Sequence, residues 1–508
     1  MTRAFLLFIL SFIHVSVSGQ VKVEKWKVFE LVLQGPSTGN PFMDVDLSAV
    51  FQQAEKTFFV EGFYDGSGVY KIRFMPPSEG EWAYVTTSNS ITLNEKRGGL
   101  IATPPRADNH GPVQVSETFS FAYADGKPHY SLGTTCYAWM HQGDSLADLT
   151  LKTLSKGYFN KLRMCIFPKY YAYNRREPLL YPFEGKPLTD WDYTRFNPAY
   201  FRNIERRIRQ LDSLAIEADL IVFHSYDHWG FQNMDAATDD RYIRYIIARF
   251  AAFKNVWWSM ANEYDLLEKK SHSDWDRFIK LFFKKDPYQH LRSIHQAYTS
   301  YNHSDPLLTH VSIQSPETSL AKELTLKHNK PVVFDEIRYE GNIPYSWGNL
   351  TAQEMVNRFW QGVTNGGHIG HGETYTTEKP LQSPERSNDI LWWSHGGELK
   401  GESQHRIKFL RQVLEKAPGF LSPVWLWDEK ALPYSAVGFK DEYFLIYLGI
   451  QYQPRGTILN LPNDKKYSIE VIDTWNMKLS KLPGIYSGQQ LIELPAKPGM
   501  ALRVTAMK

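Results

Sequence analysis

Short apolar runs alternate with longer stretches of helical spacing across the middle of the chain, between residues 129 and 375. Eight runs stand out, and they read HYSLGTTCYAW, KLRMCIFP, EADLIVFHSYD, NVWWSMANEYD, RSIHQAY, HVSIQSP, PVVFDEIRYEG and GHIGHGETY. Eight strands that alternate with helices predict a (β/α)8 barrel, also called a TIM barrel. An open doubly wound sheet would carry a Gly-rich phosphate turn after its first strand, and the first run has no such pattern.

The two flanks of this region follow another pattern. Residues 20–105 and 421–508 alternate apolar and polar residues between turn signals such as DG, SG and EG, which is typical of antiparallel β-sandwiches. We therefore predict a multidomain α/β plus all-β chain, with an N-terminal β-sandwich at 20–105, a barrel at 106–420 and a C-terminal β-sandwich at 421–508. A length of 508 residues agrees with several domains.

Residues 1–19 have the pattern of a secretory signal peptide. Arg3 supplies the charged start, residues 4–13 are mostly apolar, and small residues lead to an expected cleavage near Gly19. This apolar run is too short for a membrane anchor, and no later segment could span a bilayer, so we expect no membrane insertion. The protein is therefore expected to be exported, to a periplasm or outside the cell.

The net charge and the cysteines limit which partners and which kinds of chemistry are expected. The formal net charge of +2 gives no reason to expect nucleic acid or an anionic membrane surface as a partner. Cys136 and Cys165 are the only cysteines, which excludes a disulfide framework. They fall in adjacent predicted strands, so one bridge is geometrically possible, but buried free thiols are favoured. A thiol nucleophile is not expected, because no nearby histidine is arranged to activate one.

Two carboxylates end apolar runs of the predicted barrel. Glu263 ends the fourth strand and Glu336 ends the seventh, and barrel active sites are built at these carboxyl ends. The fourth and seventh strands lie across the barrel mouth from each other, so the two side chains should face one another. If Phe334 faces the barrel interior, alternation turns Glu336 inward as well and Asp335 toward the helices. Such a pair is what hydrolysis of a sugar acetal needs, one group to protonate the leaving oxygen and one to attack or shield the anomeric carbon.

The order of these acids and the runs around them resemble a known family. Asn262 precedes Glu263, and the runs RMCIFPKYYAYN, EADLIVFHSYDHWGFQNM, VWWSMANEYDL, FDEIRYEGNI, HGETY and LWWSHGGELKGES extend the match. The chain resembles the exported bacterial family with an apiosidase-like or cellulase-like barrel between two β-sandwiches, and the clan A retaining glycoside hydrolases more widely. The resemblance implies that Glu263 is the general acid/base and that Glu336 is the nucleophile. It also implies that Asn262 hydrogen-bonds the sugar hydroxyl next to the anomeric carbon.

Other side chains near the predicted strand ends are candidates for binding substrate. His224 and Tyr226 end the third strand, where they could bind sugar hydroxyls or hold the loops together. Glu373 ends the eighth strand and could bind substrate or hold His371. The charge on Glu336 should also raise the pKa of Glu263.

Aromatic side chains are the remaining candidates. Trp139, at the end of the first strand, and Trp392, with its neighbour Trp393 in a Gly-rich loop, are predicted to form stacking platforms for sugar rings. Tyr173 lies in the long loop after the second strand, with Tyr170 and Tyr171, and could line one flank of the cleft.

These residues together predict a retaining glycoside hydrolase that acts on poly- or oligosaccharides by double displacement. The alternatives are a transglycosylase or a furanoside-specific glycosidase that uses the same carboxylates, and a non-catalytic carbohydrate-binding protein. Because no HExxH motif or Cys/His cluster is present, we expect neither a catalytic metal nor a cofactor, and a structural Ca²⁺ stays open.

Overall fold

The computed structural model describes residues 21–377, 389–427 and 434–507 of the chain. The predicted signal peptide, residues 1–19, therefore lies outside the described residues. Among those that are described, no helix combines the length and the apolar character needed to cross a bilayer.

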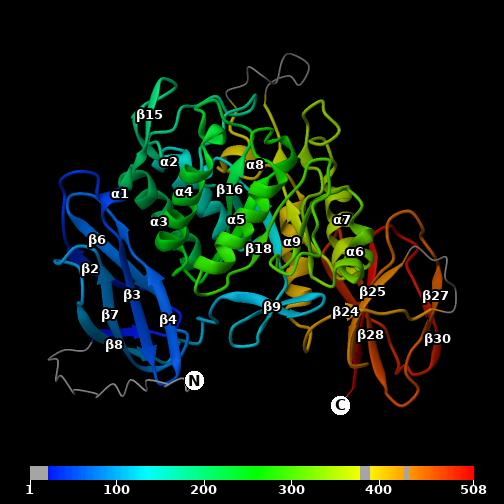
Figure 1. The fold of residues 1–508 in the computed structure, drawn as a ribbon. Coiled ribbons are helices and arrows are strands. Elements are labelled where there is room, and N and C mark those ends of the chain that lie inside the picture. The colour runs from blue at the N-terminus through cyan, green and yellow to red at the C-terminus, as the bar shows by residue number, and fades with distance from the viewer. Residues whose placement is uncertain (1–20, 378–388, 428–433, 508) are drawn as a thin grey trace, which may run out of the picture.

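Eight parallel strands form one sheet in the middle of the chain (Figure 1). They are β12 (Leu132–Thr135), β13 (Lys161–Cys165), β16 (Glu217–His224), β17 (Val256–Asn262), β18 (Arg292–Ser293), β19 (Val311–Gln314), β20 (Val332–Glu336) and β22 (His368–His371). The first strand, β12, pairs with the last, β22, so the sheet curves back on itself. Between β18 and β19 the Thr309 amide donates to the Arg292 carbonyl at 2.9 Å. The predicted barrel is confirmed, and each strand lies within one of the eight apolar runs.

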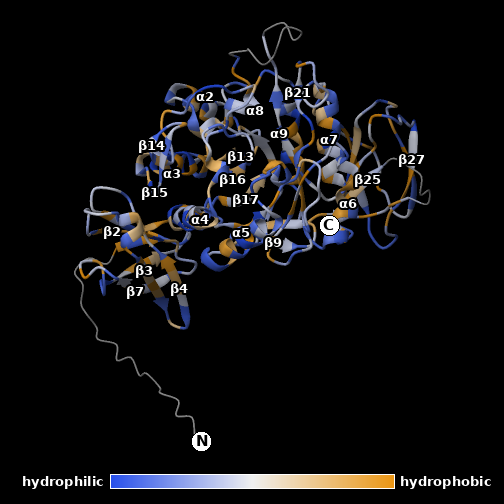
Figure 2. Cartoon of the chain, turned by 45° about the horizontal axis from the view of Figure 1, so that its top comes forward, coloured by the Kyte–Doolittle hydropathy of each residue, from blue (hydrophilic) through white to orange (hydrophobic). Residues whose placement is uncertain are grey.

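Helices cover the outside of this sheet. They are α2 (Asp144–Leu154), α3 (Pro198–Ser213), α4 (Ala236–Phe250), α5 (His272–Lys285), α6 (Ala321–His328), α7 (Ala352–Thr364), the single turn α8 (Trp392–His395) and α9 (Ser403–Leu414). Their apolar faces pack on the strands, and hydrophobic residues accordingly follow central strands such as β16 and β17 while many outer loops are hydrophilic (Figure 2). Residues 294–310, which join β18 to β19, form no helix in the structure. The sequence had already offered no helical stretch there.

The N-terminal β-sandwich lies on one side of the barrel, beside α3 and α4 (Figure 1). One sheet has the order β1 (Val21–Glu24), β8 (Arg97–Thr103), β7 (Gly80–Ser88), β3 (Leu47–Gln53) and β4 (Lys56–Glu61), and the other has β2 (Phe29–Gln34), β6 (Val69–Phe74) and β5 (Phe63–Tyr64). The short helix α1 (Pro41–Asp44) stands between β2 and β3. Phe51 and Phe74 stack between the sheets with ring centroids 4.1 Å apart.

Buried ion pairs join this sandwich to the barrel. Arg73 of β6 donates to Glu205 of α3 at 2.9 Å, and Arg249 of α4 donates to Glu205 at 2.6 Å and to Asp65 at 2.9 Å. Two guanidinium groups and two carboxylates thus compensate one another inside the interface. Because removal of one member would leave a buried charge without its partner, these contacts fix how the two domains meet.

The C-terminal β-sandwich lies on the opposite side, against α7 (Figure 1). Its larger sheet has the order β24 (Ser422–Pro423), β25 (Ser435–Phe439), β26 (Tyr443–Tyr447), β31 (Met500–Ala506), β28 (Tyr467–Asp473) and β29 (Lys478–Lys481), and its smaller one pairs β27 (Gly456–Asn460) with β30 (Gln489–Glu493). Tyr447 donates to Asn357 at 2.9 Å, and the Thr364 and Ser435 hydroxyls lie 2.6 Å apart. Polar contacts to α7 therefore hold this domain as well.

A small antiparallel sheet covers the amino ends of the barrel strands. It consists of β9 (Val113–Glu117), β10 (Ser120–Tyr123) and β11 (Pro128–His129). The Phe121 ring of β10 lies 5.1 Å from Trp257, 5.6 Å from His310 and 4.7 Å from His368, all near strand starts. We call these three short strands the floor sheet.

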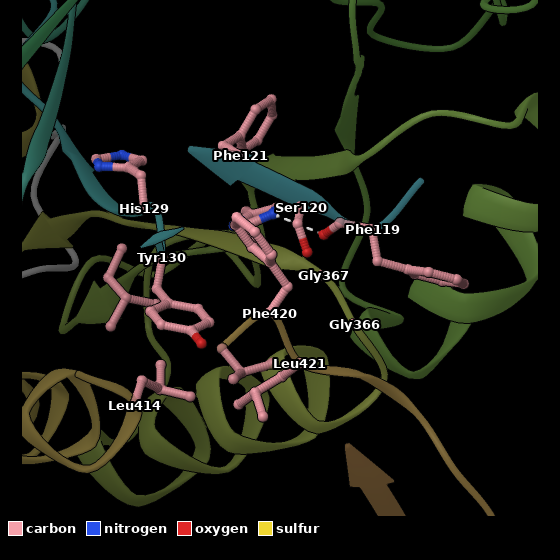
Figure 3. Close-up of a pocket in the computed structure, with 13 residues that line it drawn as sticks. Phe119, Ser120, Phe121, His129, Tyr130, Gly366, Gly367, Leu414, Phe420 and Leu421 are labelled. Carbon is pink, nitrogen blue, oxygen red and sulfur yellow. Dashed lines mark hydrogen bonds between the residues drawn. The ribbon is translucent and has the colours of Figure 1, made fainter. Parts of the chain in front are cut away.

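A cavity of about 20 Å³ remains beside the floor sheet, among Phe119, Tyr130, Gly367 and Phe420 (Figure 3). This volume holds about one water molecule, so the amino end of the barrel is filled by side chains.

Charged side chains occupy the interior of the barrel. The Lys161 ammonium donates to Asp219 at 2.7 Å and to Asp335 at 2.6 Å, and Arg163 lies 3.7 and 3.8 Å from the same carboxylates. All four side chains are at most 2% exposed. Two cations and two anions therefore balance in this group, which we call the interior quartet.

The predicted orientation of Asp335 is wrong. Asp335 points into the barrel, where the interior quartet needs a second anion, and Phe334 packs in the outer core that includes α7. Glu336 still reaches the barrel mouth, because the register between β19 and β20 shifts at Gln314, opposite Glu336. Strict alternation does not hold past such an irregularity.

The two cysteines are free and buried, which confirms the interpretation favoured by the sequence. Burial raises the pKa of the Cys165 thiol to about 12, so it stays protonated.

Candidate active site

A cavity of about 500 Å³ opens at the carboxyl ends of the barrel strands. Its volume lies within the usual range for small-molecule sites. Its wall contains eight aromatic rings, those of Tyr137, Tyr171, Tyr173, Tyr226, Tyr298, Tyr339, Trp347 and Trp393. Its other polar side chains are those of Lys169, Asn262, Glu263, Gln314, Ser315, Glu336, Arg338 and Ser346. The cavity thus brings Glu263 and Glu336 together with a ring-lined wall.

Glu263 directly follows β17 in a left-handed backbone conformation, with φ 55° and ψ 59°. Non-glycine residues seldom adopt this conformation, and it costs on the order of 1 kcal/mol. The Glu263 amide approaches His295 Nδ1 at 3.4 Å, and the next amide, of Tyr264, donates to the His295 carbonyl at 2.9 Å. His295, in the loop after β18, therefore holds the turn that carries this carboxylate.

Two side chains donate to one oxygen of Glu263. The Tyr226 hydroxyl donates to Oε2 at 2.5 Å and the Asn262 amide donates to the same atom at 3.0 Å. Burial, and next the like charge of Glu336, raise the pKa of Glu263 to about 6, against the opposing effects of Lys169 and Tyr226. The carboxyl can therefore carry a proton in weakly acidic solution, and Oε1 is the oxygen left to carry it.

Glu336 is the last residue of β20 and accepts a short hydrogen bond from the Tyr137 hydroxyl at Oε1. The Tyr339 ring lies close by. Burial, and next the charge of Glu336, raise the pKa of Tyr137 and of Tyr339 well above the usual value. Both phenols therefore stay protonated and can donate to Glu336.

Polar side chains connect the two carboxylates. The Tyr137 oxygen that contacts Glu336 also lies 3.0 Å from Asn262 Oδ1, and Asn262 Nδ2 donates to Glu263. Arg163 of the interior quartet donates to Asn262 Oδ1 at 3.2 Å and fixes the orientation of the amide. The two carboxyl groups thus lie on one cavity, joined through only two intervening side chains.

The structure places five of the predicted site residues on the cavity wall. These are Glu263, Glu336, Asn262, Tyr226 and Tyr173. Tyr173 contacts Trp347 and Trp393 by ring edges, with centroids 5.6 and 5.2 Å apart.

The predictions that Trp139 and Trp392 form stacking platforms are wrong. Trp139 is fully buried and donates its Nε1–H to the Ala147 carbonyl of α2, so its ring belongs to the core. Trp392 is 1% exposed and donates to Thr134 of β12, whereas the next residue, Trp393, lines the cavity. Trp392 and Trp393 both belong to the single turn α8, in which neighbouring side chains point in different directions.

His224 and Glu373 also lie away from the cavity, which corrects their predicted contact with substrate. His224 is buried, its Nε2 lies 3.2 Å from the Phe167 carbonyl, and burial lowers its pKa to about 3. Glu373 accepts from the amides of Lys400 and Gly401 at 2.7 and 2.8 Å. Each side chain fastens a loop, which was the other interpretation offered for His224.

Within the described residues, one group of three side chains has the spacing of a metal site, namely Glu340, His371 and Glu373. Both carboxylates already accept backbone amides of residues 400–403 at the start of α9. Such amide contacts use the oxygens that a cation would need. The donor set therefore fits a clamp on this loop better than a metal, and Glu340 and Glu373 complement the helix N-terminus.

Several wall residues were not predicted as site residues, including Tyr137, Lys169, Tyr339 and Trp347. The sequence does contain a signal for Tyr137, because this residue lies near the end of the first barrel strand, two residues before Trp139. Lys169 and Trp347 lie in loops, where neither period nor strand end marks an inward side chain.

Three protein families match parts of the chain. The family described as "Apiosidase-like, catalytic domain" matches residues 116–420, more than half of the chain. Two families described as domains of unknown function, DUF5060 and DUF5605, match residues 22–89 and 427–505. The comparison with curated proteins gave no match.

Solved structures resemble large parts of the chain. A protein from Bacteroides vulgatus ATCC 8482 that carries the provisional name glycoside hydrolase shares 40% identity and a TM-score of 0.89, over 96% of this chain and 100% of that one. A glycoside hydrolase family 5 protein from the same organism shares 16% identity and a TM-score of 0.60, over 78% and 93% of the two chains. A further structure named glycoside hydrolase shares 16% identity and a TM-score of 0.61, over 78% and 97%. At 16% identity the likeness shows the fold.

Proposed function

Because the chain belongs to the family of apiosidase-like catalytic domains and is a glycoside hydrolase, we propose that it cleaves O-glycosidic bonds of poly- or oligosaccharides with retention of configuration. In this proposal Glu336 is the nucleophile and Glu263 is the general acid/base. The family likeness supports the reaction class, and the site residues support the division of roles.

One observation carries the proposal, namely the polar connection from Glu263 through Asn262 and Tyr137 to Glu336. Retaining enzymes need carboxyl groups about 5–5.5 Å apart, whereas inverting enzymes separate them by about 6.5–9.5 Å to admit a water. This connection and the effect of Glu336 on the pKa of Glu263 support carboxyl groups that lie near each other, and from them we infer the nearer arrangement.

The first step would form a bond between a Glu336 oxygen and the anomeric carbon. The glycosidic C–O bond breaks, its electron pair goes to the leaving oxygen, and the proton on Glu263 Oε1 goes to that same oxygen. In the second step a water attacks the anomeric carbon and gives its proton to Glu263, while the ester electron pair returns to Glu336. Tyr137 would hold the nucleophile in place in the first step and favour its departure in the second.

The wall of the cavity supports a carbohydrate substrate. Rings such as Trp393, Trp347 and Tyr173 offer flat apolar faces on which the C–H groups of a sugar can pack. Asn262 keeps a polar atom at the cavity beside Glu263, where a sugar hydroxyl would approach.

The roles of the carboxylates are tested with Glu336→Ala and Glu263→Ala against a panel of 4-nitrophenyl glycosides that includes furanosides. Each variant should lose turnover of whichever glycoside the wild type cleaves, while Glu323→Ala, on the exposed outside of α6, should not. Azide should rescue Glu336→Ala with a glycosyl azide of inverted configuration and Glu263→Ala with one of retained configuration. Full activity in either variant, or an inverted sugar released by the wild type, would overturn the proposed roles.

We also propose that the chain is exported, to a periplasm or outside the cell, on the basis of its first 19 residues. The same chain expressed with and without residues 1–19 tests this. The longer form should lose the segment and leave the cytoplasm, and retention of an uncleaved chain in the cytoplasm would contradict export.

A further inference from the structure

Lys169 occupies an unusual place in the cavity. It lies in the loop after β13, its side chain is buried, and it lines the cavity wall. Its ammonium lies 3.6 Å from the ring centroid of Tyr137, 4.1 Å from that of Tyr226 and 4.7 Å from that of Tyr171. Ring faces attract a cation but are much weaker partners than a carboxylate. In the part of the chain that the structure describes, no carboxylate forms an ion pair with Lys169.

The rings on either side of this ammonium belong to the tyrosines that hold the two acids. Tyr137 donates to Glu336, and Tyr226 donates to Glu263. The ammonium therefore lies near both carboxylates, and its charge interacts with each of them without an ion pair to either. An ion pair with one acid would stabilise the charge of only that acid, whereas a cation at this position can stabilise negative charge on either one.

We propose that Lys169 is a shared counter-ion, which stabilises negative charge on Glu336 before the first step and on Glu263 after it. The inference rests on the proposed roles of these two acids and adds a third residue to their mechanism. In this proposal Lys169 tunes the electrostatics of the site and forms no bond to the substrate.

The reaction itself moves the charge across the site. Before the first step Glu336 is ionised and Glu263 is protonated. When a Glu336 oxygen bonds the anomeric carbon, Glu336 becomes a neutral ester, and Glu263, having given its proton to the leaving oxygen, becomes the anion. The second step reverses both changes, so the net charge of the pair stays at minus one while its location alternates. A cation that interacts with both carboxylates can stabilise each state without moving.

Other groups around Lys169 do not take over this role. Arg163 is neutralised within the interior quartet, and Asp265 is occupied by the backbone amides of residues 297–299. Burial raises the pKa of the Cys165 thiol and of the three surrounding tyrosine hydroxyls, so all four stay neutral. Arg338 lines the same cavity but is exposed, so water screens its charge.

The direction of the electrostatic effects agrees with this arrangement. The positive charge of Lys169 lowers the pKa of Glu263, and the negative charge of Glu336 raises it. Once Glu336 is esterified, its opposing charge is gone, and the pKa of Glu263 falls further under the influence of Lys169. That is the change an acid needs in order to become the base of the second step.

The test replaces Lys169 by methionine, which has a similar length, no charge and a good fit among rings. The pKa of Glu263 is read in the free enzyme by carboxyl-¹³C NMR, with its signal identified from Glu263→Gln. We expect the pKa of Glu263 to rise by about one unit in Lys169→Met, because a nearby buried cation is removed. Both limbs of the pH profile of kcat/KM, measured with a 4-nitrophenyl glycoside that the wild type cleaves, should move to higher pH.

Two further variants control this experiment. Arg338→Met removes a cation from the same cavity and should shift the pKa of Glu263 much less, because that charge is exposed. Lys169→Arg keeps the charge and should leave the pKa of Glu263 near its wild-type value. If Lys169→Met does not fold, Lys169→Gln tests the same loss of charge.

Two outcomes overturn the inference. One is an unchanged pKa of Glu263 in the uncharged variants, and the other is a fall in kcat without any shift of the pH profile. Failure of the proposed function would look different, because Glu263→Ala or Glu336→Ala would then retain activity, whatever Lys169 does.

Discussion

At the amino ends of the barrel strands, the Phe121 ring is enclosed by Trp257, His310 and His368, and the remaining cavity measures about 20 Å³. At the carboxyl ends of the same strands, the cavity measures about 500 Å³. Both ends contain titratable groups whose pKa values are changed by burial. At the floor, burial lowers the pKa of His310 to about 3 and of His368 to about 4, so both imidazoles are neutral and pack as apolar rings.

The two ends differ in how neighbouring charges balance the effect of burial on the pKa. At the mouth, a like charge and a nearby cation act on Glu263 in opposite directions and leave its pKa in the range where a proton can be exchanged. At the floor, burial outweighs the neighbouring charges and keeps both imidazoles uncharged. One end of the barrel thus supplies stability and the other supplies chemistry, and substitutions at the two ends should separate these properties.

The largest effect is expected at the mouth. Glu336→Ala should lower kcat by a factor of about 10⁴ or more, because it removes the proposed nucleophile. Its thermal unfolding temperature should not fall, since a charge is removed from a partly buried site that the fold does not require. Calorimetry and initial rates check the two statements. A large drop in the unfolding temperature would break the proposed separation of the two ends.

A substitution at the floor should do the reverse. Phe121→Ala removes a ring that is 1% exposed and should cost about 3–5 kcal/mol of stability. Its kcat/KM per folded molecule should stay near the wild-type value. Urea unfolding measures the first effect and active-site titration combined with rates measures the second. Val115→Ala in β9, where the side chain is 39% exposed, is the matched control and should change stability by less than about 0.5 kcal/mol.

Two adjacent tryptophans allow the comparison to be made within a single turn. Trp392→Phe should cost about 2 kcal/mol of stability, because Thr134 loses its donor in a buried place, and should leave kcat/KM unchanged. Trp393→Phe should lower kcat/KM by a factor of about 5, because part of the ring surface on the cavity wall is lost. Equal effects of the two variants on either property would contradict their assignment to core and cavity.

The smallest effect concerns pH. Burial raises the pKa of Glu217, at the start of β16, to about 8, so the native state holds a proton that the unfolded chain releases near its ordinary value of 4.5. The stability that this proton contributes is complete below about pH 4.5 and is lost as pH rises through about 8. Glu217→Gln should therefore flatten the decrease in unfolding free energy between pH 5 and 8. Activity should respond separately, because kcat/KM should fall as pH rises through about 6, where Glu263 ionises. If Glu217→Gln shifted the pH profile of kcat/KM, the two ends would not be independent.

The repeating part of the structure could be predicted from the sequence. The barrel strands are largely apolar because helices cover them outside and buried side chains fill them inside, so each one appears as a short run between polar stretches. Counting these runs gave Glu263 and Glu336 their places at the fourth and seventh strand ends. The count depends only on periodicity, which local sequence contains.

The orientation of single side chains could not be predicted in the same way. Asp335 points inward because Lys161, on a strand across the sheet, needs a counter-charge, and that need is not visible near residue 335. Trp392 and Trp393 are neighbours in the sequence, and the bond from Trp392 to Thr134, far away in the chain, distinguishes the core ring from the cavity ring. Lys169 contacts rings of residues 137 and 226, which lie on different strand ends. Each of these outcomes depends on a contact between distant parts of the chain.

The floor sheet precedes all the barrel strands in the chain, yet the Phe119 carbonyl accepts its contact from His368, 249 residues later. Contacts at such separation form slowly, because a long loop must close before any of them can be made. During synthesis, the first segment of the barrel domain to be made is thus among the last to find its partners. The contacts of Phe119 and Phe121 with His368 cannot form until the eighth strand has been added. The floor sheet can therefore complete its contacts with the barrel only after the last barrel strand has been made.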